Sequence, residues 1–293
     1  MKDIMLLFDT DRYVTPFDIL IAYDSGFDIV VPIAQVEAKS VTALTQDAMF
    51  PRGVKGVGHT TIFVGGKDVD EAKKILKNVK KSMFPPFEIS IIVDPRGGHT
   101  TASALVAKID NVLSEKGFEG LKGKKVVILA GTGQVGQLAA TICACEGADV
   151  IITSRKKSRA EEIASEIEKE EGIKIKGMQG ANDDEIFEAV KDADVIITAG
   201  KAGVCLVNTE MLKKLDKCKV VADVNAVPPL GIEGLELSDD GKEILPGVFG
   251  LGALATGDLK YKTEMAVLNA AREAKKGVFD YKFAFEKAKE LLK

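Results

Sequence analysis

The sequence predicts an α/β protein with two successive parallel-sheet domains, and three observations lead to this class. Short apolar runs rich in Ile, Val and Phe alternate with amphipathic stretches almost from end to end. Such alternation is typical of parallel strands joined by helical crossovers. A polar, glycine-bearing segment at residues 115–125 interrupts the series, and a second series follows it. We therefore expect two sheets with a hinge between them.

The first series contains strands separated by helices. The expected strands span 4–8, 28–33, 60–64 and 88–93, and the expected helices span 16–25, 40–48 and 69–83, with another starting near residue 101. Pro16 suits a first helical turn with Thr15 as the cap, because the N–H that proline lacks would have no partner there. We expect residues 1–119 to form this N-terminal parallel-sheet domain, completed by an amphipathic helix within residues 278–293.

The second series, expected over residues 120–277, contains a glycine-rich turn. Its strands are expected at 125–130, 148–153, 173–177, 193–198 and 219–224. The first of them runs into the segment Gly131, Thr132, Gly133, Gln134, Val135 and Gly136, and an apolar helix follows. A Gly-x-Gly-x-x-Gly turn between a strand and a helix is typical of a Rossmann-type, doubly wound dinucleotide-binding domain. The alternative is a glycine turn that serves only the fold.

The composition limits the class of protein. Apolar residues make up 46% of the 293 residues and charged residues 29%, which is the balance of a globular protein. The net charge of −4 excludes a broadly basic nucleic-acid binder. The apolar run at 4–8 is too short for an export signal or a membrane span, so we expect a cytoplasmic protein. The four cysteines have no paired spacing, which argues against disulfides. Two histidines are too few for a histidine-rich metal site, so an organic cofactor is expected to supply the chemistry.

The strand expected at 148–153 favours NADP over NAD. An NAD-binding domain usually ends this strand with a carboxylate that holds the ribose 2′-hydroxyl. Here Ser154, Arg155 and Lys156 follow the strand instead, and a guanidinium can bind a 2′-phosphate through two hydrogen bonds. The alternative is a solvated basic start to a helix, which fits Lys157 and Arg159 better than Arg155. NADP is therefore favoured, and NAD stays possible.

Two further loops follow strands of the second domain. One contains Thr198, Ala199 and Gly200, and the other contains Asp223 and Asn225. Ligands of open α/β sheets bind outside the carboxyl ends of the strands, so both loops are placed to face the nicotinamide and its ribose. Either loop could equally be ordinary turn chemistry.

Several segments taken together resemble one family, the NAD(P)-dependent methylene-tetrahydromethanopterin dehydrogenases. The segments are TPFD at 15–18, DPRGGHTT at 94–101, AGTG at 130–133, DVNAVPPLGI at 223–232 and GALATGDLKYK at 252–262. They span nearly the full length, in the family's order. The resemblance implies hydride transfer from the methylene bridge of a reduced pterin to the coenzyme, an N-terminal pterin-binding domain, and a homotrimer or homohexamer.

The resemblance also implies roles for particular residues. Lys260 matches the family's functional lysine, and Phe17, Thr100 and Thr101 match residues beside the pterin. Asp94, at the end of an expected strand, could bind the guanidine-like edge of the pterin. Each has a plainer alternative: an exposed lysine, core packing for Phe17, a helix cap for the threonines and a turn for Asp94. Arg96 and His99 receive no role.

Other activities remain open at this stage. Hydride loss from the bridge leaves a delocalised cation, so no catalytic Ser-His-Asp or Cys-His set is needed, and the sequence shows none. A methylene-tetrahydrofolate dehydrogenase would use the same chemistry. A non-catalytic NADP-binding sensor could share the fold. A shikimate-type dehydrogenase is suggested by the Ser154-Arg155-Lys156 stretch, but the first domain offers no evident lysine–aspartate pair for it.

Overall fold

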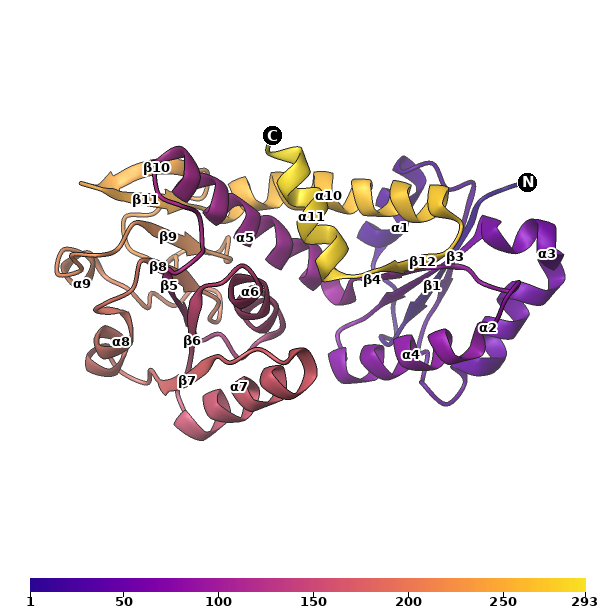
Figure 1. Cartoon of the computed structure of the whole chain (residues 1–293), viewed down its shortest axis with the longest axis horizontal. Helices are drawn as coiled ribbons and strands as arrows, with labels where there is room; N and C mark the ends of the chain where they lie inside the picture. Colours follow the sequence, from indigo (N-terminus) through magenta and orange to yellow (C-terminus); the bar gives the residue numbers. More distant parts are fainter. The chain divides into compact units, whose positions relative to one another are not determined.

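The computed structural model describes all residues, 1–293, as two compact units (Figure 1). The N-terminal unit contains Met1–Thr100 and Tyr261–Lys287, and the central unit contains Thr101–Lys260 and Ala288–Lys293. Both units are α/β, as the sequence predicts. No helix of the structure combines the length and the apolar character that crossing a membrane would require.

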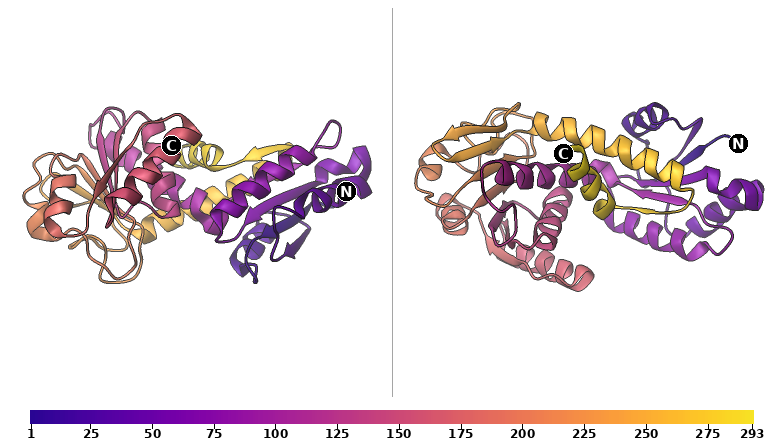
Figure 2. Two further views of the ribbon diagram at one scale, coloured as in Figure 1. Left: turned by 90° about the horizontal axis from the view of Figure 1, so that it is seen from below. Right: turned by 45° about the horizontal axis from the view of Figure 1, so that its top comes forward.

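The division between the units lies inside two long helices, α5 (Gly98–Glu115) and α10 (Ala253–Ala274). Helix α10 is seen as one continuous helix in the right-hand view of Figure 2. The division thus differs from the boundaries expected at residues 119 and 277. The apolar period of a helix that continues from one unit into the next does not show where the boundary between the units lies. The polar segment 115–125 is only a turn within the central unit.

The N-terminal unit contains a five-stranded parallel sheet in the order β12-β4-β3-β1-β2. Four strands lie close to the expected ranges: β1 (Ile4–Asp9), β2 (Ile29–Ile33), β3 (Thr60–Gly65) and β4 (Ser90–Val93). The fifth, β12 (Gly277–Phe279), comes from the far end of the chain and has no counterpart among the expected strands. Three residues are too few to produce a recognisable apolar pattern.

Helices cover both faces of this sheet. On one face α1 (Pro16–Asp24) and α10 share an apolar cluster with Met5 and Leu7 of β1. On the other face α2 (Val41–Met49) and α4 (Val69–Ser82) pack on Phe8 of β1. The alternation of Leu7 and Phe8 between the two clusters follows from the two-residue period of a strand. Shorter elements complete the unit: η1 (Phe50–Arg52), α3 (Gly53–Gly56), η2 (Val57–His59), η3 (Pro95–Gly97) and α11 (Tyr281–Leu291), whose last turn belongs to the central unit.

The central unit contains a seven-stranded sheet in the order β10-β11-β9-β8-β5-β6-β7. Its parallel strands are β5 (Lys125–Leu129), β6 (Asp149–Ser154), β7 (Lys176–Gln179), β8 (Val195–Thr198), β9 (Val220–Asp223) and β11 (Val248–Leu251). Only β10 (Asp240–Leu245) is antiparallel. Counted from β5, the parallel strands have the order 3-2-1-4-5-6 of the Rossmann fold, which confirms the predicted class.

Four helices lie between these strands, and the last two of them cover one apolar core. The four helices are α6 (Gln134–Cys145), α7 (Lys157–Glu171), α8 (Asp183–Val190) and α9 (Thr209–Leu212). The core contains fully buried residues from the central strands, among them Val127, Ile196 and Val221. The strand expected at 173–177 lies instead at β7, three residues later at its start. It is an edge strand with a partly exposed, polar sequence, so its apolar pattern is weak.

Candidate functional site

The three glycines of the turn after β5 have three different surroundings. A Cβ atom on Gly131 would lie 2.9 Å from the carbonyl oxygen of Ile128, and one on Gly136 would lie 2.7 Å from the Cα of Gly131. A Cβ atom on Gly133 would meet nothing within 4 Å. Gly131 and Gly136 are therefore required by the close approach of turn, strand and helix. Gly133 borders open space, which is required of a residue whose backbone a pyrophosphate approaches.

The N-terminus of α6 faces the same open side. Gly133 is the N-cap residue, and no side chain caps the helix. The N–H groups of a first helical turn and the helix dipole favour an anion at this end. Thr132, Gln134 and Val135 flank the turn. The residues present therefore fit the pyrophosphate of a dinucleotide.

Hydrogen bonds join this turn to the strands on both sides. The N–H of Ala130 donates to Thr153 Oγ1 and that of Gly131 to the Thr153 carbonyl, both at 3.0 Å. On the other side the N–H of Ala199 donates to the Leu129 carbonyl at 3.0 Å. Since β6 and β8 flank β5, the strand order reverses here, which is where doubly wound sheets bind their ligands. The predicted glycine, Ser154 and Ala199 segments are thus brought to one edge of the sheet.

The cations after β6 fall into two groups. Lys157 pairs with Glu161 at 3.6 Å and Arg159 with Glu162 at 2.7 Å. Arg155 and Lys156 are exposed and have no ion-pair partner. They lie at the N-terminus of α7, whose first turn contains no acidic residue. Cations are disfavoured at this end of a helix, so the arrangement is suited to receive an anion such as a 2′-phosphate.

The loops after β8 and β9 are tied together by Asn225. Its Nδ2 donates to the Gly200 carbonyl at 3.0 Å, and both residues are partly exposed. Thr198 is fully buried and donates through Oγ1 to the Ala222 carbonyl at 3.3 Å. Ala199, Gly200 and Asn225 are therefore accessible from the ligand side, whereas Thr198 supports the sheet.

Asp223 lies beneath this edge. It is fully buried, and its Oδ2 accepts a hydrogen bond from the Gly231 N–H at 2.6 Å. Its Oδ1 accepts from the N–H of Asn225 at 3.1 Å. Both carboxylate oxygens thus anchor the loop that runs from β9 to Gly231. Asp223 is therefore buried beneath the loop and supports Asn225.

In the N-terminal unit, Asp94 and Thr100 contact one another. Asp94 Oδ1 accepts from the N–H groups of His99 and Thr100 at 2.7 and 3.3 Å, and its Oδ2 accepts from Thr100 Oγ1 at 2.6 Å. Both residues are buried, and the carboxylate satisfies the first turn of α5. The sequence leaves open a cap formed by the threonines and a turn at Asp94; in the structure Asp94 accepts from the helix N–H groups and Thr100 donates to Asp94. Thr101 is partly exposed in the same helix.

Phe17 and Lys260 remain accessible. The Phe17 side chain is 47% exposed in the first turn of α1, so it does not fill the core of the N-terminal unit. Thr15 caps this helix, as the sequence predicts, with its Oγ1 accepting from the Phe17 N–H at 3.2 Å. Lys260 is partly exposed on α10.

Sequence reasoning misses a charged group at the carboxyl edge of the N-terminal sheet. Asp9 ends β1, Asp11 follows it, and Arg96 follows β4 and forms an ion pair with Asp11. Asp9 is buried, and this burial raises its carboxyl pKa above the ordinary value. The strand order β2-β1-β3-β4-β12 corresponds to 2-1-3-4-5, whose order reverses between β1 and β3. An aspartate at the last position of β1 and another two residues later are the signal that could have found the group.

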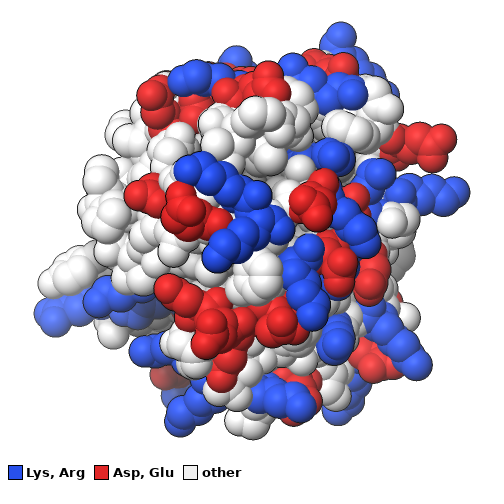
Figure 3. Space-filling model, turned by 90° about the vertical axis from the view of Figure 1, so that its left-hand side faces the viewer, with Lys and Arg blue, Asp and Glu red and all other residues white.

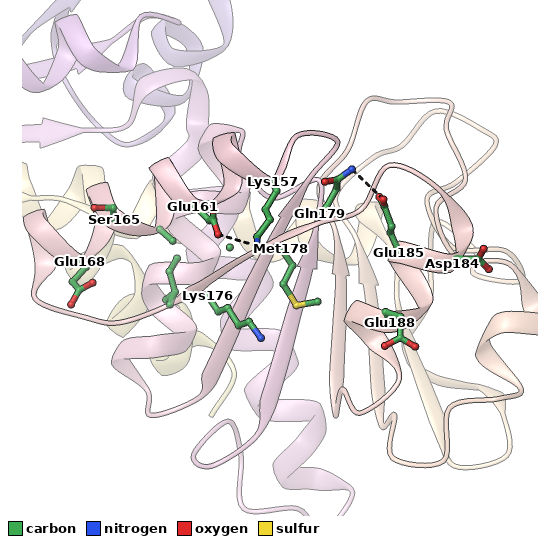
Figure 4. Close-up of a pocket in the computed structure, with 13 residues that line it drawn as sticks. Lys157, Glu161, Ser165, Glu168, Lys176, Met178, Gln179, Asp184, Glu185 and Glu188 are labelled. Carbon is green, nitrogen blue, oxygen red and sulfur yellow. Dashed lines mark hydrogen bonds and ion pairs between the residues drawn. The ribbon is translucent and has the colours of Figure 1, made fainter.

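Neither a cavity on the outer edge nor the surface charge marks a competing site. A cavity of about 730 Å³ runs along the edge strand β7 between α7 and α8, two strands away from β5 (Figure 4). Two pairs of its polar side chains bond one another: Lys157 is paired with Glu161, and Gln179 donates to Glu185 at 3.1 Å. On the face shown in Figure 3, acidic and basic side chains are intermingled. That face has no broad basic surface of the kind that binds nucleic acid.

The strand order, the glycine turn and the accessible edge define a dinucleotide-binding α/β protein of the dehydrogenase class. Residues 112–230, all in the central unit, match the shikimate / quinate 5-dehydrogenase family. Solved structures show the same fold along most of the chain. Shikimate 5-dehydrogenase from Listeria monocytogenes has a TM-score of 0.52 at 14% identity, with 97% of this chain and 96% of that chain covered. The 5-ketofructose reductase of a Gluconobacter strain has a TM-score of 0.51 at 16% identity, with 99% of both covered.

More similar sequences identify the family. Residues 16–96 match the N-terminal domain of methylene-tetrahydromethanopterin dehydrogenase. The chain is 35% identical to the NAD(P)-dependent methylenetetrahydromethanopterin dehydrogenase of Methylorubrum extorquens, over 96% of this chain and 95% of that protein. It is 37% identical to the bifunctional protein MdtA of the same organism, over 99% of both. The chain belongs to the family of NAD(P)-dependent methylenetetrahydromethanopterin dehydrogenases, which confirms the resemblance seen in its motifs.

Proposed function

We propose that this chain transfers a hydride from the methylene bridge of methylene-tetrahydromethanopterin to NADP, giving methenyl-tetrahydromethanopterin and NADPH. The observation that carries this proposal is the 35% identity to a dehydrogenase of that name over 96% of the chain. The exposed cations Arg155 and Lys156, which have no carboxylate partner, support NADP as the coenzyme.

The reaction demands alignment more than proton transfer. Loss of the hydride leaves a cation that is delocalised over the two bridge nitrogens, so no base has to act on the reacting carbon. When bound, the nicotinamide ring accepts the hydride at its C4 atom. The chain has to hold the reacting atoms about 3–3.5 Å apart.

In the central unit, each accessible group suits one part of the coenzyme. Gly133 and the first turn of α6 would bind the pyrophosphate. Arg155 and Lys156 would bind the 2′-phosphate, and the edge formed by Gly200 and Asn225 would border the nicotinamide ribose. Asp223 keeps Asn225 in place from below.

In the N-terminal unit, Phe17 offers an accessible ring face on which the pterin can stack. We assign Lys260, which belongs to the central unit, as a hydrogen-bond donor to the pterin. Its ammonium group carries three donors and no acceptor, so its partner is a ring nitrogen or oxygen. A non-catalytic NADP-binding sensor would bind the coenzyme yet be indifferent to Lys260→Ala.

Initial rates for the four combinations of tetrahydromethanopterin or tetrahydrofolate derivative with NADP or NAD test the proposal. We expect the highest rate with methylene-tetrahydromethanopterin and NADP. A higher rate with methylene-tetrahydrofolate would favour the second candidate, and a relative named as bifunctional keeps that candidate in view. NADP binding in calorimetry without turnover on either pterin would favour the sensor.

We also propose that the protein is a cytoplasmic homo-oligomer. All four cysteines are free, as is usual in a reducing compartment. Burial raises the pKa of the Cys218 thiol to about 12, so this thiol is inert. The edge strand β2 and the adjoining helix α1 expose Leu20, Tyr23 and Val31, and we propose a second copy of the chain as the partner for this apolar face.

A further inference from the structure

Arg96 is held in one position although no motif gives it a role. It lies in the η3 turn after β4 with a φ of 52°, the left-handed region that non-glycine residues rarely adopt. Its Nη2 forms an ion pair with Asp11 Oδ2. The Arg96 side chain is 50% exposed, whereas that of Asp11 is 8% exposed. A buried carboxylate thus fixes a guanidinium that is open to a ligand.

Asp11 in turn is fixed by three loops. Its N–H donates to Asp9 Oδ1 at 2.7 Å, and its Oδ1 accepts from the Lys67 N–H at 3.3 Å. Its carbonyl accepts from the Gln35 N–H at 2.9 Å. The loops after β1, β2 and β3 therefore converge on Asp11. Gly66 permits this approach, because a Cβ atom there would lie 2.7 Å from Asp9 Oδ1.

The pair lies where a doubly wound sheet binds its ligand. Asp11 follows β1 and Arg96 follows β4, so the ion pair crosses the carboxyl end of β3, at the point where the strand order reverses. A separate cavity of about 510 Å³ lies beside the loops after β1 and β2; its lining includes Thr10 and Gln35 but neither Asp11 nor Arg96. Helix α1 begins after the same loop and presents Phe17.

We infer that Arg96 is a specificity-determining residue that donates hydrogen bonds to the ring oxo group of the pterin, with Asp11 as its positioning residue. This inference rests on the proposed function. A guanidinium has five N–H donors and no acceptor, and the ion pair leaves several donors for a ligand acceptor. Because Asp11 balances the charge of Arg96, a neutral carbonyl suits the pair better than an additional anion. The carboxylate of Asp11 already has protein partners and stays beneath the ligand.

Calorimetric titration of tetrahydromethanopterin into the full chain and its variants tests the inference. We expect Arg96→Gln to raise the Kd for the pterin about 10- to 100-fold, the range of one charge-assisted hydrogen bond, and to leave the Kd for NADP unchanged. Arg96→Lys should restore only part of the affinity, because the fork of donors is lost. Asp11→Asn should weaken binding in the wild-type background and add little to Arg96→Gln.

Arg52→Gln is the matched control. Arg52 belongs to the same unit but donates to the Lys2 carbonyl ahead of β1, at the amino edge of the sheet, so the pterin Kd should not change. A pterin Kd in folded Arg96→Gln equal to that of the wild type overturns the inference. Should Asp11→Asn fail to fold, the half-exposed Arg96 still decides the question. A wild type that binds the pterin without turnover refutes the dehydrogenase function alone, and one that does not bind it refutes both.

Discussion

Arg155 and Lys157 lie two residues apart after β6 but differ in their partners. Lys157 has Glu161, whereas Arg155 has no carboxylate partner and stays exposed. If Arg155 binds the 2′-phosphate, Arg155→Ser should lower kcat/KM for NADP about 10- to 100-fold, since a charge-assisted hydrogen bond contributes about 1.5–3 kcal/mol. The value for NAD should hardly change. Steady-state kinetics with both coenzymes measure the ratio, with Lys157→Ser as control; an unchanged ratio in Arg155→Ser would remove the assignment.

The glycines of the turn allow fold and coenzyme binding to be separated. Gly136→Ala places a Cβ atom against backbone of Gly131, so we expect a loss of about 1–3 kcal/mol in unfolding free energy. Gly133→Ala meets no protein atom within 4 Å and should leave stability unchanged. It should instead raise the Kd for NADP roughly tenfold, or about 1.4 kcal/mol. Thermal melts and NADP titrations of both variants test this, and the opposite pattern would mean that Gly133 faces no ligand.

At the scale of the element, the first turn of α5 contains the Asp94 cap and the enclosed imidazole of His99. The Nδ1 atom of His99 has no hydrogen-bond partner, and its ring meets that of Tyr281 edge-on at 5.8 Å. Burial lowers the pKa of His99 below its ordinary 6.5, and Lys73 acts in the same sense, whereas Asp94 and Asp280 act in the opposite sense. The neutral ring is therefore the form that the folded chain prefers.

This preference has a consequence for stability below neutral pH. The folded pKa is lowered, so stability is complete above about pH 6.5, the pKa of an unfolded histidine, and is lost as pH falls toward the folded value. We expect the melting temperature to fall between pH 7 and pH 5 more steeply for the wild type than for His99→Gln. Scanning calorimetry across this range measures both slopes. Parallel curves would show that His99 makes no contribution.

The elements that the sequence predicts correctly are those with a strong apolar period. Strands β1, β5 and β8 are buried on both faces, so each reads as an apolar run. The hairpin of β10 and β11 lacks this signal, since β10 is the polar segment DGKEIL at a sheet edge. Strand β12 is too short to be recognised. Sequence thus predicts the central strands and the apolar edge strand β2, and misses β12 and the β10–β11 hairpin.

The residues of the candidate site also differ in how well sequence predicts their surroundings. The glycine turn and Arg155 are local patterns; Gly133 borders open space and Arg155 is exposed, and their coenzyme roles stay predictions. For Asp94 and Asp223 the sequence permits either a ligand contact or a turn; both side chains are buried and accept hydrogen bonds from backbone N–H groups. An aspartate at the end of a strand has the same sequence context in either role. Only the hydrogen-bond partners of the carboxylate distinguish the two roles, and these partners depend on the folded conformation.

At the scale of the whole molecule, the exposed apolar face of α1 and β2 predicts self-association. Leu20 and Tyr23 are 63% and 48% exposed, and Val31 on the edge strand is 38% exposed. We expect light scattering to give a multiple of 31.3 kDa for the wild type and a smaller mass for Leu20→Glu. Leu254→Glu, a change at a 57% exposed leucine of the central unit, is the control. A monomeric wild type would contradict the prediction.

The five-stranded sheet also determines the order in which the chain can mature. Its last strand is β12, and its core includes Val267, Leu268 and Ala271, which a ribosome adds only after the whole glycine-turn region. The first hundred residues, translated alone, would leave Met5 and Leu7 without the apolar cover that these later residues provide. The N-terminal unit is therefore not a continuous segment that a single crossover can exchange. A chimaera that borrows it has to take both of its segments, 1–100 and 261–287, from the same parent.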